Sequence, residues 1–463
     1  MKGAFRATAS KRAKPDSIVA KFEAARGSKE IVARRSASPG SKIIVESGGT
    51  WAFCALLALI PAVSGTARGL FIPGLRTSDV LVIVCVVAIA FRWGASVVPF
   101  DRVGGSLLLY GLIYSLTTLL NFIERPELPS HALLKEMLGA PQYVLLYCAT
   151  FAVSHKVDIV QTWARLSTTI AASVGVLAVL QSADIGATRK FLSFITGNPD
   201  IASPIPWMAP RSTGPFYSWH ALGIYLAING LICMAVILGF PRTRTAMFGM
   251  LVRLSLILLG LATGLTFTPL VILVIGFCLI VGVKRALLLL PVIIVAGFTL
   301  LLTTKLGEQF GSRVDAQERV ASGASPLLPQ TIGYRVNAWV NDYLPLIGEN
   351  LWDGYGPLGE RDRIFQFSES MYINLLTIGG IPLLLTFLLF MIRSVKSMNY
   401  VRKLEDIHPQ VRTLGLAMAV VMESLLFAQF IHPYMADAGG AAMVIVALGV
   451  INGRVRAVAA DCP

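Results

Sequence analysis

The stretch GPFYSWHALGIYLAINGLICMAVIL, residues 214–238, contains no Asp, Glu, Lys or Arg. Because an α-helix needs roughly 20 mostly apolar residues to cross a bilayer, this stretch predicts a transmembrane helix. The whole chain has the same character: 55% of its 463 residues are hydrophobic and 14% are charged, whereas soluble globular proteins have about 25% charged residues. We therefore predict an all-α polytopic membrane protein. A single soluble core, a disulfide scaffold and a disordered chain are excluded.

Further apolar stretches along the chain also predict spanning helices, which gives about twelve spans in all. The expected spans are 48–66, 78–92, 104–123, 132–154, 159–182, 214–238, 248–265, 268–283, 286–303, 369–391, 412–431 and 437–453. The seventh and eighth spans meet at Thr266-Phe267-Thr268-Pro269, which fits either a tight turn or a kink. The six cysteines have no metal or redox spacing, so we interpret them as apolar packing residues.

The basic residues predict the orientation of these spans, because cytoplasmic loops carry an excess of Lys and Arg. With the N-terminus inside, every short inside connection is basic, whereas the outside connections 266–268 and 432–436 have no Lys or Arg and 124–131 has only Arg125. Both termini are therefore expected in the cytoplasm. Residues 1–46 hold eleven Lys or Arg and four Asp or Glu, and they read as a flexible, disordered tail attracted to anionic lipids, not as a nucleic-acid binder.

Two long segments are expected on the outer side, at 183–213 and 304–368. The larger one carries apolar residues at helical spacing, from Ile332 to Tyr343, and a loop of this length with its own helix is usually functional. The predicted organisation is a tail (1–46), nine helices with the smaller outer loop (47–303), the large outer loop (304–368), helices ten to twelve (369–453) and a cytoplasmic tail (454–463).

Arg211 ends the smaller outer loop and precedes Ser212-Thr213-Gly214 at the start of the sixth span. A guanidinium beside free backbone N–H groups at a helix N-terminus suits an anion, although an interfacial arginine could equally contact lipid headgroups. His220 follows about two turns deeper. It is either a member of the site or a packing residue.

Aromatic residues accompany an arginine in the large outer loop. Arg335 and Trp339 are four apart, with Asn337 between them, so on a helix they share one face that could hold a guanidinium or offer a ring to a sugar. Trp352 and Tyr355 surround a glycine turn, which also suits carbohydrate. The alternative for these rings is the aromatic belt at the membrane surface.

Glu369 and Tyr372 open the tenth span and are expected on one helix face. A carboxylate partly buried at that depth suits a general base, while a helix-start carboxylate favoured by the macrodipole is the alternative. Glu423, near the middle of the eleventh span, is interpreted as structurally paired or functional. The chain has no GxxxxGK[ST], HExxH or CxxC motif, so we expect no nucleotide, metal or cofactor.

Three motifs together resemble the bacterial O-antigen ligase and polymerase superfamily, whose members act on polyprenyl-diphosphate-linked glycans. They are Arg211 to Phe216 continuing to Gly223, then Arg335 with Trp339 and the later Gly354-Tyr355-Gly356, and finally Glu369 to Pro382. The resemblance covers roughly residues 205–385. It implies a GT-C-like membrane fold of about twelve helices, with a large periplasmic loop between helices nine and ten.

The resemblance also implies an activity: a glycosyltransferase of the bacterial inner membrane that joins undecaprenyl-diphosphate-linked repeat units of lipopolysaccharide or exopolysaccharide on the periplasmic face. In this hypothesis Arg211 and Arg335 hold the diphosphate of the donor, and Glu369 takes the proton of the acceptor sugar. The residues implied in substrate binding are Trp339, Tyr355, Trp352, Tyr372, His220 and Asn337. The implied partners are the glycan donor and acceptor, membrane lipids and a chain-length regulator.

Two departures separate the chain from the family pattern. Members often carry Ser-Arg where this chain has Thr268-Pro269, and ligases carry a histidine shortly before the tenth span, whereas this chain has none between His220 and His408. The second departure favours a repeat-unit polymerase over an O-antigen ligase. A lipid-linked glycan exporter and a membrane acyltransferase are the alternatives from other functional classes.

Overall fold

The computed structural model describes residues 48–93 except 73, 101–124, 139–202, 211–240, 243–282, 330–357 and 368–461, with the single residues 133, 137 and 311. The chain divides into two units after Ser47, and the second unit is described here. Within the described residues every regular element is a helix. The predicted all-α class is therefore confirmed.

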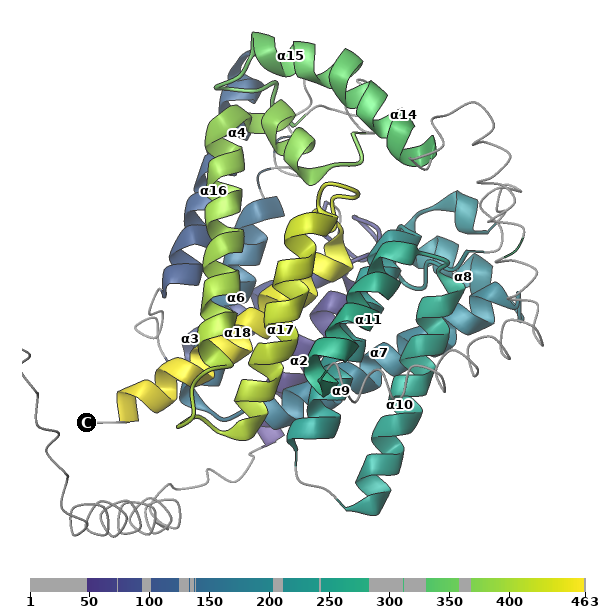
Figure 1. The fold of residues 1–463 in the computed structure, drawn as a ribbon, viewed down its shortest axis with the longest axis vertical. Helices are drawn as coiled ribbons and strands as arrows, with labels where there is room; N and C mark the ends of the chain where they lie inside the picture. The colour runs from purple at the N-terminus through teal and green to yellow at the C-terminus, as the bar shows by residue number, and fades with distance from the viewer. Residues whose placement is uncertain are drawn as a thin grey trace, which may run out of the picture. The chain divides into compact units, whose positions relative to one another are not determined.

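The helices follow the chain as shown in Figure 1. Their bounds are α2 Gly48–Val63, α3 Thr77–Trp93, α4 Arg102–Glu124, α6 Gly139–Lys156, α7 Val160–Ser182, α8 Thr188–Thr196, η2 Pro199–Ile201, α9 Trp219–Gly239, α10 Arg244–Thr263, α11 Phe267–Val281, α14 Gln330–Ala338, the π-helical turn η3 Trp339–Tyr343, α15 Leu344–Glu349, α16 Met371–Val401, α17 Pro409–Ala428 and α18 Ala438–Asp461.

Seven of the described helices are long and apolar enough to cross a membrane: α4, α7, α9, α10, α16, α17 and α18. Two shorter helices, α2 and α11, are also apolar. A multi-pass helical membrane protein is thus confirmed, whereas the total of twelve spans stays a prediction. The expected span 286–303 and the expected tail 1–46 lie outside the described residues.

Helix α9 forms the centre of the bundle. It packs against α7, α10, α11, α17 and α18, and its residues from Ala221 to Val236 are all buried. A helix that is apolar on every side is buried either among other helices or in lipid, and here other helices surround it. Its one amide in this stretch, Asn229, is satisfied because Ser167 of α7 donates a hydrogen bond of 2.7 Å to Oδ1.

Glycines allow α7 and α10 to approach closely. A Cβ atom added at Gly260 would lie 2.4 Å from the Cα of Gly175, and one at Gly175 would lie 2.4 Å from the carbonyl oxygen of Leu256. Small residues commonly bring transmembrane helices into backbone contact, where van der Waals packing holds them together. These two glycines fix how α10 lies against the rest of the bundle.

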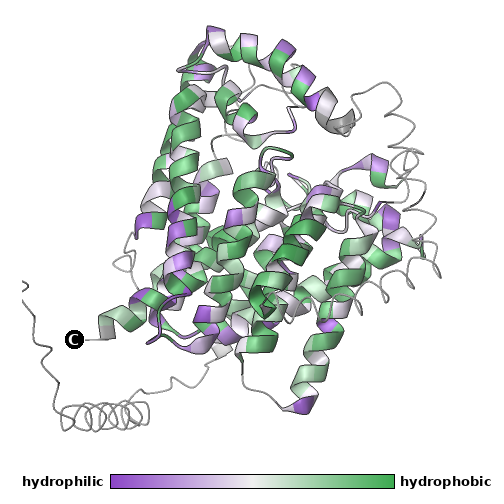
Figure 2. Ribbon diagram, in the orientation of Figure 1, coloured by the Kyte–Doolittle hydropathy of each residue, from purple (hydrophilic) through white to green (hydrophobic). Residues whose placement is uncertain are grey.

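The described loops gather at two ends of the bundle. At the first, which we call the basic end, Arg454 pairs with Asp158 at 3.0 Å and Arg393 donates to the carbonyl of Arg102 at 3.3 Å. The α16–α17 connection and the start of α10 also lie there and are hydrophilic, as Figure 2 shows. This end holds the described connections expected inside.

The opposite end, which we call the site end, holds the described loops expected outside. Backbone hydrogen bonds join them: Ala67 N to Ile195 O at 2.8 Å, Ser212 N to Thr263 O at 3.0 Å, and Met371 N to Gln429 O at 2.8 Å. The alternation of loops between two ends therefore agrees with the predicted alternation. That the basic end faces the cytoplasm stays a prediction from the positive-inside rule.

Two helix boundaries differ from those expected, and the open alternative between α10 and α11 is decided. Helix α9 begins at Trp219 and not at 214, because Ser218 caps it by accepting a hydrogen bond of 3.1 Å from the Ala221 amide. Helix α16 begins at Met371, two residues after Glu369, so Glu369 does not share a helix face with Tyr372. Between α10 and α11 the chain makes a turn at residues 264–266. The seventh and eighth expected spans are therefore joined by a turn and not by a kink.

The glycines around residue 380 break α16 and dock an outer segment onto it. Gly379 and Gly380 leave helical geometry, and Gly380 has a φ of 60°. At this break Tyr355 N donates to Thr377 O at 2.7 Å and Ile381 N donates to Leu351 O at 2.9 Å. We call residues 351–356 together with 377–381 the α16 clamp. It ties the segment after α15 to the bundle at the site end.

Candidate functional site

Helix α14 and the chain before α16 bring three predicted residues together. Arg335 Nε donates to Glu369 in an ion pair, with side chains 18% and 43% exposed. One turn later, Trp339 Nε1 donates a hydrogen bond of 2.6 Å to the carbonyl of Ser368. The expected shared face of Arg335 and Trp339 therefore exists, and both side chains hold the same short segment.

The backbone presents Glu369 in an unusual conformation. Its φ is +50°, which is uncommon for a residue with a side chain and is often found at functional sites. The flanking residues hold it there, since Ser368 Oγ donates to the carbonyl of Ser370 at 3.1 Å and Met371 N donates to Gln429 O. The residue is partly buried, as expected, and its carboxylate lies beside the Arg335 guanidinium.

Next to this pair lies a group of residues that we call the histidine cluster: His220, His432, Tyr434 and Asp437. The rings of His220 and His432 stack with centroids 3.9 Å apart, and Tyr434 meets His432 edge-on at 4.8 Å. His432 Nε2 lies 3.0 Å from Asp437 Oδ2. His220 is also close enough to Arg335 to interact with it electrostatically.

Tyr434 shows how the ion pair and the histidine cluster meet. Burial raises the pKa of its hydroxyl above the ordinary value, and the charge of Asp437 raises that pKa further. A hydrogen bond with Thr268 and the charge of Arg335 act in the opposite direction. One hydroxyl is thus influenced by charges from α14 and from the α17–α18 loop.

Arg211 lines a separate cavity of about 170 Å³, which we call the Arg211 cavity. Its guanidinium lies over the ring of Trp219, 4.5 Å from the ring centroid, and the residue is only 9% exposed. The buried Arg211 Nε and Trp219 Nε1 have no hydrogen-bond partner among the described residues. Arg189, also nearly buried, lines the same cavity. Buried donors without partners suit a ligand rich in acceptors.

The backbone beside Arg211 does not provide the free amides that we expected. The N–H groups of Thr213 and Gly214 both donate to Gln181 Oε1 at 2.9 Å, and Ser212 Oγ donates to the carbonyl of Ala178. These bonds fix the segment onto α7, so its polar groups are already used. Anion binding here therefore depends on the arginine side chains and not on a helix N-terminus.

Four other predicted residues have different surroundings. Tyr372 packs between α16 and α17, where its hydroxyl donates to the carbonyl of Leu426 and its ring lies 4.4 Å from that of Phe430. Tyr355 is held in the α16 clamp. Trp352 is largely exposed, and Asn337 is exposed and accepts a hydrogen bond from Asn341. The described contacts do not connect these four side chains with the histidine cluster.

Glu423 has a partner within the bundle. Asn399 of α16 donates a hydrogen bond of 2.6 Å to Glu423 Oε1. Such a bond offsets part of the cost of placing a carboxylate in a membrane span. The contact supports the structural interpretation of Glu423 over the functional one.

The described part of the chain holds neither a cluster of metal ligands nor a disulfide. There, no group of three or more His, Cys, Asp or Glu side chains lies close enough to hold a metal ion. The five described cysteines form no disulfide with one another and lie in helices, buried or half-buried. Cys462 lies outside the described residues.

Sequence reasoning missed His432, Tyr434 and Asp437, which lie in the short loop between α17 and α18. The signal was present, because HPYMAD places three chemistry-bearing side chains in an outer connection without Lys or Arg. Only the fold shows that this loop reaches His220, which is more than 200 positions earlier in the chain.

A scan of protein-family models and a search of curated proteins found no match to this chain. The geometry of this site therefore carries the proposal of a function.

Proposed function

We propose that the protein is a polysaccharide polymerase of the bacterial inner membrane. It joins undecaprenyl-diphosphate-linked oligosaccharide repeat units on the periplasmic face by metal-independent glycosyl transfer. The observation that carries the proposal is the Arg335–Glu369 ion pair beside the histidine cluster, at the same end of the bundle as Arg211. A glycosyl transfer from a diphosphate needs cationic donors for the leaving group and an acceptor for one proton. Both are available there.

The Arg211 cavity suits the diphosphate of the donor. Two nearly buried arginines line it, and the unpartnered Arg211 Nε can donate to a phosphate oxygen. Guanidinium groups grip phosphate oxygens through paired donors and stay charged at every relevant pH. Trp219, which stacks on Arg211, is followed directly by His220, so the cavity adjoins the histidine cluster along the chain.

The transfer step requires bond exchange at the anomeric carbon of the donor. The hydroxyl oxygen of the acceptor sugar forms a bond to that carbon, and the bond from the carbon to the diphosphate oxygen breaks. The electron pair leaves with undecaprenyl diphosphate, where preorganised guanidinium donors stabilise the growing charge. Glu369 accepts the proton of the hydroxyl, and Arg335 orients Glu369 for this role.

A ligase-type transfer to a different glycan acceptor is the second candidate. The observation that favours it is His432, whose Nε2 lies 3.0 Å from Asp437 and whose ring, stacked on His220, offers a second proton acceptor. The chemistry at the donor is the same in both cases. The identity of the acceptor distinguishes the two functions.

Reconstitution tests the proposal. Purified protein in liposomes is given lipid-linked repeat units with EDTA present and without ATP, and the products are resolved by size. We expect a ladder of longer glycans that remain attached to the lipid diphosphate. Transfer to another added acceptor only would support the ligase, and movement across the bilayer without a new glycosidic bond would support an exporter. Folded protein that extends nothing, or that requires a metal ion, would contradict the proposal.

A further inference from the structure

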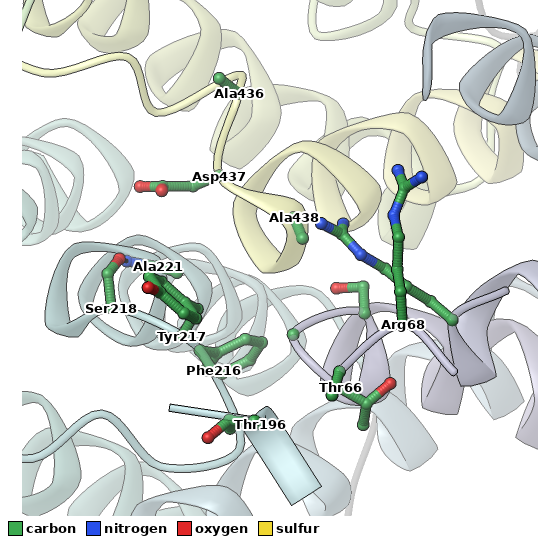
Figure 3. Close-up of a pocket in the computed structure, with 15 residues that line it drawn as sticks. Thr66, Arg68, Thr196, Phe216, Tyr217, Ser218, Ala221, Ala436, Asp437 and Ala438 are labelled. Carbon is green, nitrogen blue, oxygen red and sulfur yellow. Dashed lines mark hydrogen bonds between the residues drawn. The ribbon is translucent and has the colours of Figure 1, made fainter. Parts of the chain in front are cut away.

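A larger cavity lies at the site end, beside the histidine cluster (Figure 3). Its volume is about 420 Å³, within the range of about 300–1,000 Å³ of small-molecule sites. The α2–α3 loop, the end of α8, the chain entering α9 and the start of α18 enclose it. Figure 3 shows Arg68 and Asp437 in the lining, on different elements. We call it the Arg68 cavity.

The charged lining of the Arg68 cavity is Arg68, Arg76 and Asp437, which leaves one net positive charge. Hydroxyl groups surround these charges, and they come from Ser64, Thr66, Thr196 and Ser218. Tyr217, which is 66% exposed, contributes an open aromatic ring. The lining thus combines guanidinium donors, hydroxyl groups and one ring.

Local hydrogen bonds hold the arginine-bearing loop in a defined conformation. Thr66 Oγ1 donates to Val63 O at 2.9 Å and contacts Thr77 Oγ1 at 3.1 Å. The amide of Arg76 donates to Asp79 Oδ2 at 2.8 Å, which fixes Arg76 at the start of α3. Ala67 N binds the end of α8. A site built on a loop restrained in this way loses little conformational freedom when a ligand binds.

The Arg68 cavity shares lining residues with the rest of the proposed site. Asp437 lines the cavity and also binds His432 of the histidine cluster. Tyr217 and Ser218 line both this cavity and the Arg211 cavity. A ligand here would therefore adjoin both the Arg211 cavity and the histidine cluster.

We propose that the Arg68 cavity binds a uronic acid residue of the glycan, which is a sugar ring carrying one carboxylate. The inference rests on the proposed function for the ligand being part of a glycan. One carboxylate matches the single net positive charge, and a planar guanidinium binds a carboxylate through two parallel hydrogen bonds. Asp437 and the hydroxyl groups can bind the sugar hydroxyls, and Tyr217 can stack on the ring.

Binding of simple sugars tests this inference without relying on catalysis. Purified protein in lipid nanodiscs is titrated with glucuronate, galacturonate and mannuronate, and with glucose, galactose and mannose, while saturation-transfer NMR reports binding. We expect at least one uronate to bind tenfold or more tightly than its neutral counterpart. Arg76→Gln removes a charge-assisted contact and should weaken that uronate roughly tenfold to hundredfold. The matched control is Lys190→Gln, an exposed cation at the site end that lines neither cavity, and it should change nothing.

Three results would overturn the inference. The first is that uronates and neutral sugars bind equally tightly. The second is that inorganic phosphate binds as tightly as the uronate and depends on Arg76 in the same way. The third is that Arg76→Gln protein with a normal melting temperature binds the uronate as tightly as the unmodified protein does. Polymerisation is measured separately on the same preparation. Uronate selectivity that depends on Arg76 therefore supports the cavity assignment even where glycan extension is absent, and the missing extension then counts against the proposed function alone.

Discussion

At the residue scale, three arginines of the site end show how neighbours decide what a guanidinium can bind. Arg189 pairs with Asp184 at 3.3 Å, and Arg335 pairs with Glu369. Arg211 has an aromatic ring and an unpartnered Nε instead. A buried donor without a partner costs free energy that a ligand can recover, so Arg211 is the one most suited to hold an anion from outside the chain.

Arg211→Lys tests that assignment. Lysine keeps the positive charge but loses the paired donors and the flat stacking on Trp219, so the initial rate of glycan transfer should fall about 10²-fold or more. Arg165→Lys, at an exposed position of α7, is the matched control and should keep the normal rate. Reconstituted transfer at constant protein gives both rates. An Arg211→Lys enzyme as fast as the control would remove Arg211 from the donor site.

Asp101, just before α4, predicts a pH dependence of stability. Burial raises the pKa of its carboxyl above the ordinary value of 3.8, although hydrogen bonds from the Gly104 amide and the Tyr147 hydroxyl act in the opposite direction. The folded protein therefore binds this proton more tightly than the unfolded chain. The resulting stabilisation is present at low pH and is lost as the pH rises from about 3.8 through the folded-state pKa.

Asp101→Asn keeps an N-cap for α4 but cannot titrate. We expect the melting temperature of the unmodified protein to fall relative to that of Asp101→Asn as the pH rises from 4 to 8. Thermal unfolding in detergent across that range measures the difference. A difference between the two proteins that does not change with pH, or that changes in the opposite direction, would show that Asp101 does not carry this dependence.

The part of the site that sequence predicted is the part formed by nearby residues. Arg335 and Trp339 are four apart on one helical stretch, so their shared face follows from helix geometry. His220 was only one of several polar residues near a span end. Its partner His432 could not be identified, because their stacking depends on how α9 and the α17–α18 loop pack. Likewise, no residue near Arg211 in the sequence indicates that Gln181 accepts hydrogen bonds from the Thr213 and Gly214 amides.

At the element scale, the α16 clamp explains two glycine motifs that sequence linked only to a family resemblance. Gly354 has a φ of 66°, and a Cβ there would lie 2.6 Å from the Gly379 amide nitrogen. At Gly380 a Cβ would lie 2.4 Å from Trp352 O. The helices themselves were predictable from apolar length. The break in α16 was not, because Gly-Gly-Ile-Pro also fits a kinked continuous span.

Gly380→Ala should therefore open the clamp. At φ 60° and ψ −159°, a region that essentially only glycine occupies, alanine costs about 1–3 kcal/mol, and its methyl group overlaps the Trp352 carbonyl. We expect a lower melting temperature and slower glycan transfer, because the chain before α16 carries Glu369. The matched control is Gly348→Ala in α15, where a Cβ meets nothing within 4 Å and alanine favours the helix. Equal melting temperatures for the two variants would show that the clamp contributes no stability.

At the scale of the whole molecule, the two ends of the bundle differ in charge and in chemistry. The basic end carries clusters such as Arg402-Lys403, whereas the site end carries the ion pair, the histidine cluster and both cavities. The orientation of the two ends stays a prediction, which rests on the positive-inside rule acting on loops before the fold forms. The proposed glycosyl transfer on the periplasmic face requires the site end to face the periplasm.

Single-cysteine labelling tests the orientation. In a background without native cysteines, Lys190→Cys at the site end and Tyr400→Cys at the basic end are both exposed positions. In intact spheroplasts an impermeant maleimide should label position 190 and not position 400, and both should react after lysis. Labelling of position 400 alone in intact spheroplasts would place the site in the cytoplasm.

The central claim is that the Arg335–Glu369 pair carries out glycosyl transfer, and turnover of Glu369→Gln in the reconstituted system tests it most directly. Glutamine keeps the size of the side chain but cannot accept the acceptor's proton. Arg335→Lys keeps a charge but loses the paired donors. We predict that each variant loses about 10²–10³ in rate, with single repeat units left unextended, while Asp342→Asn, an exposed acid of the same outer segment, keeps the normal rate. Normal-length polymer at normal rates from both Glu369→Gln and Arg335→Lys would contradict the account.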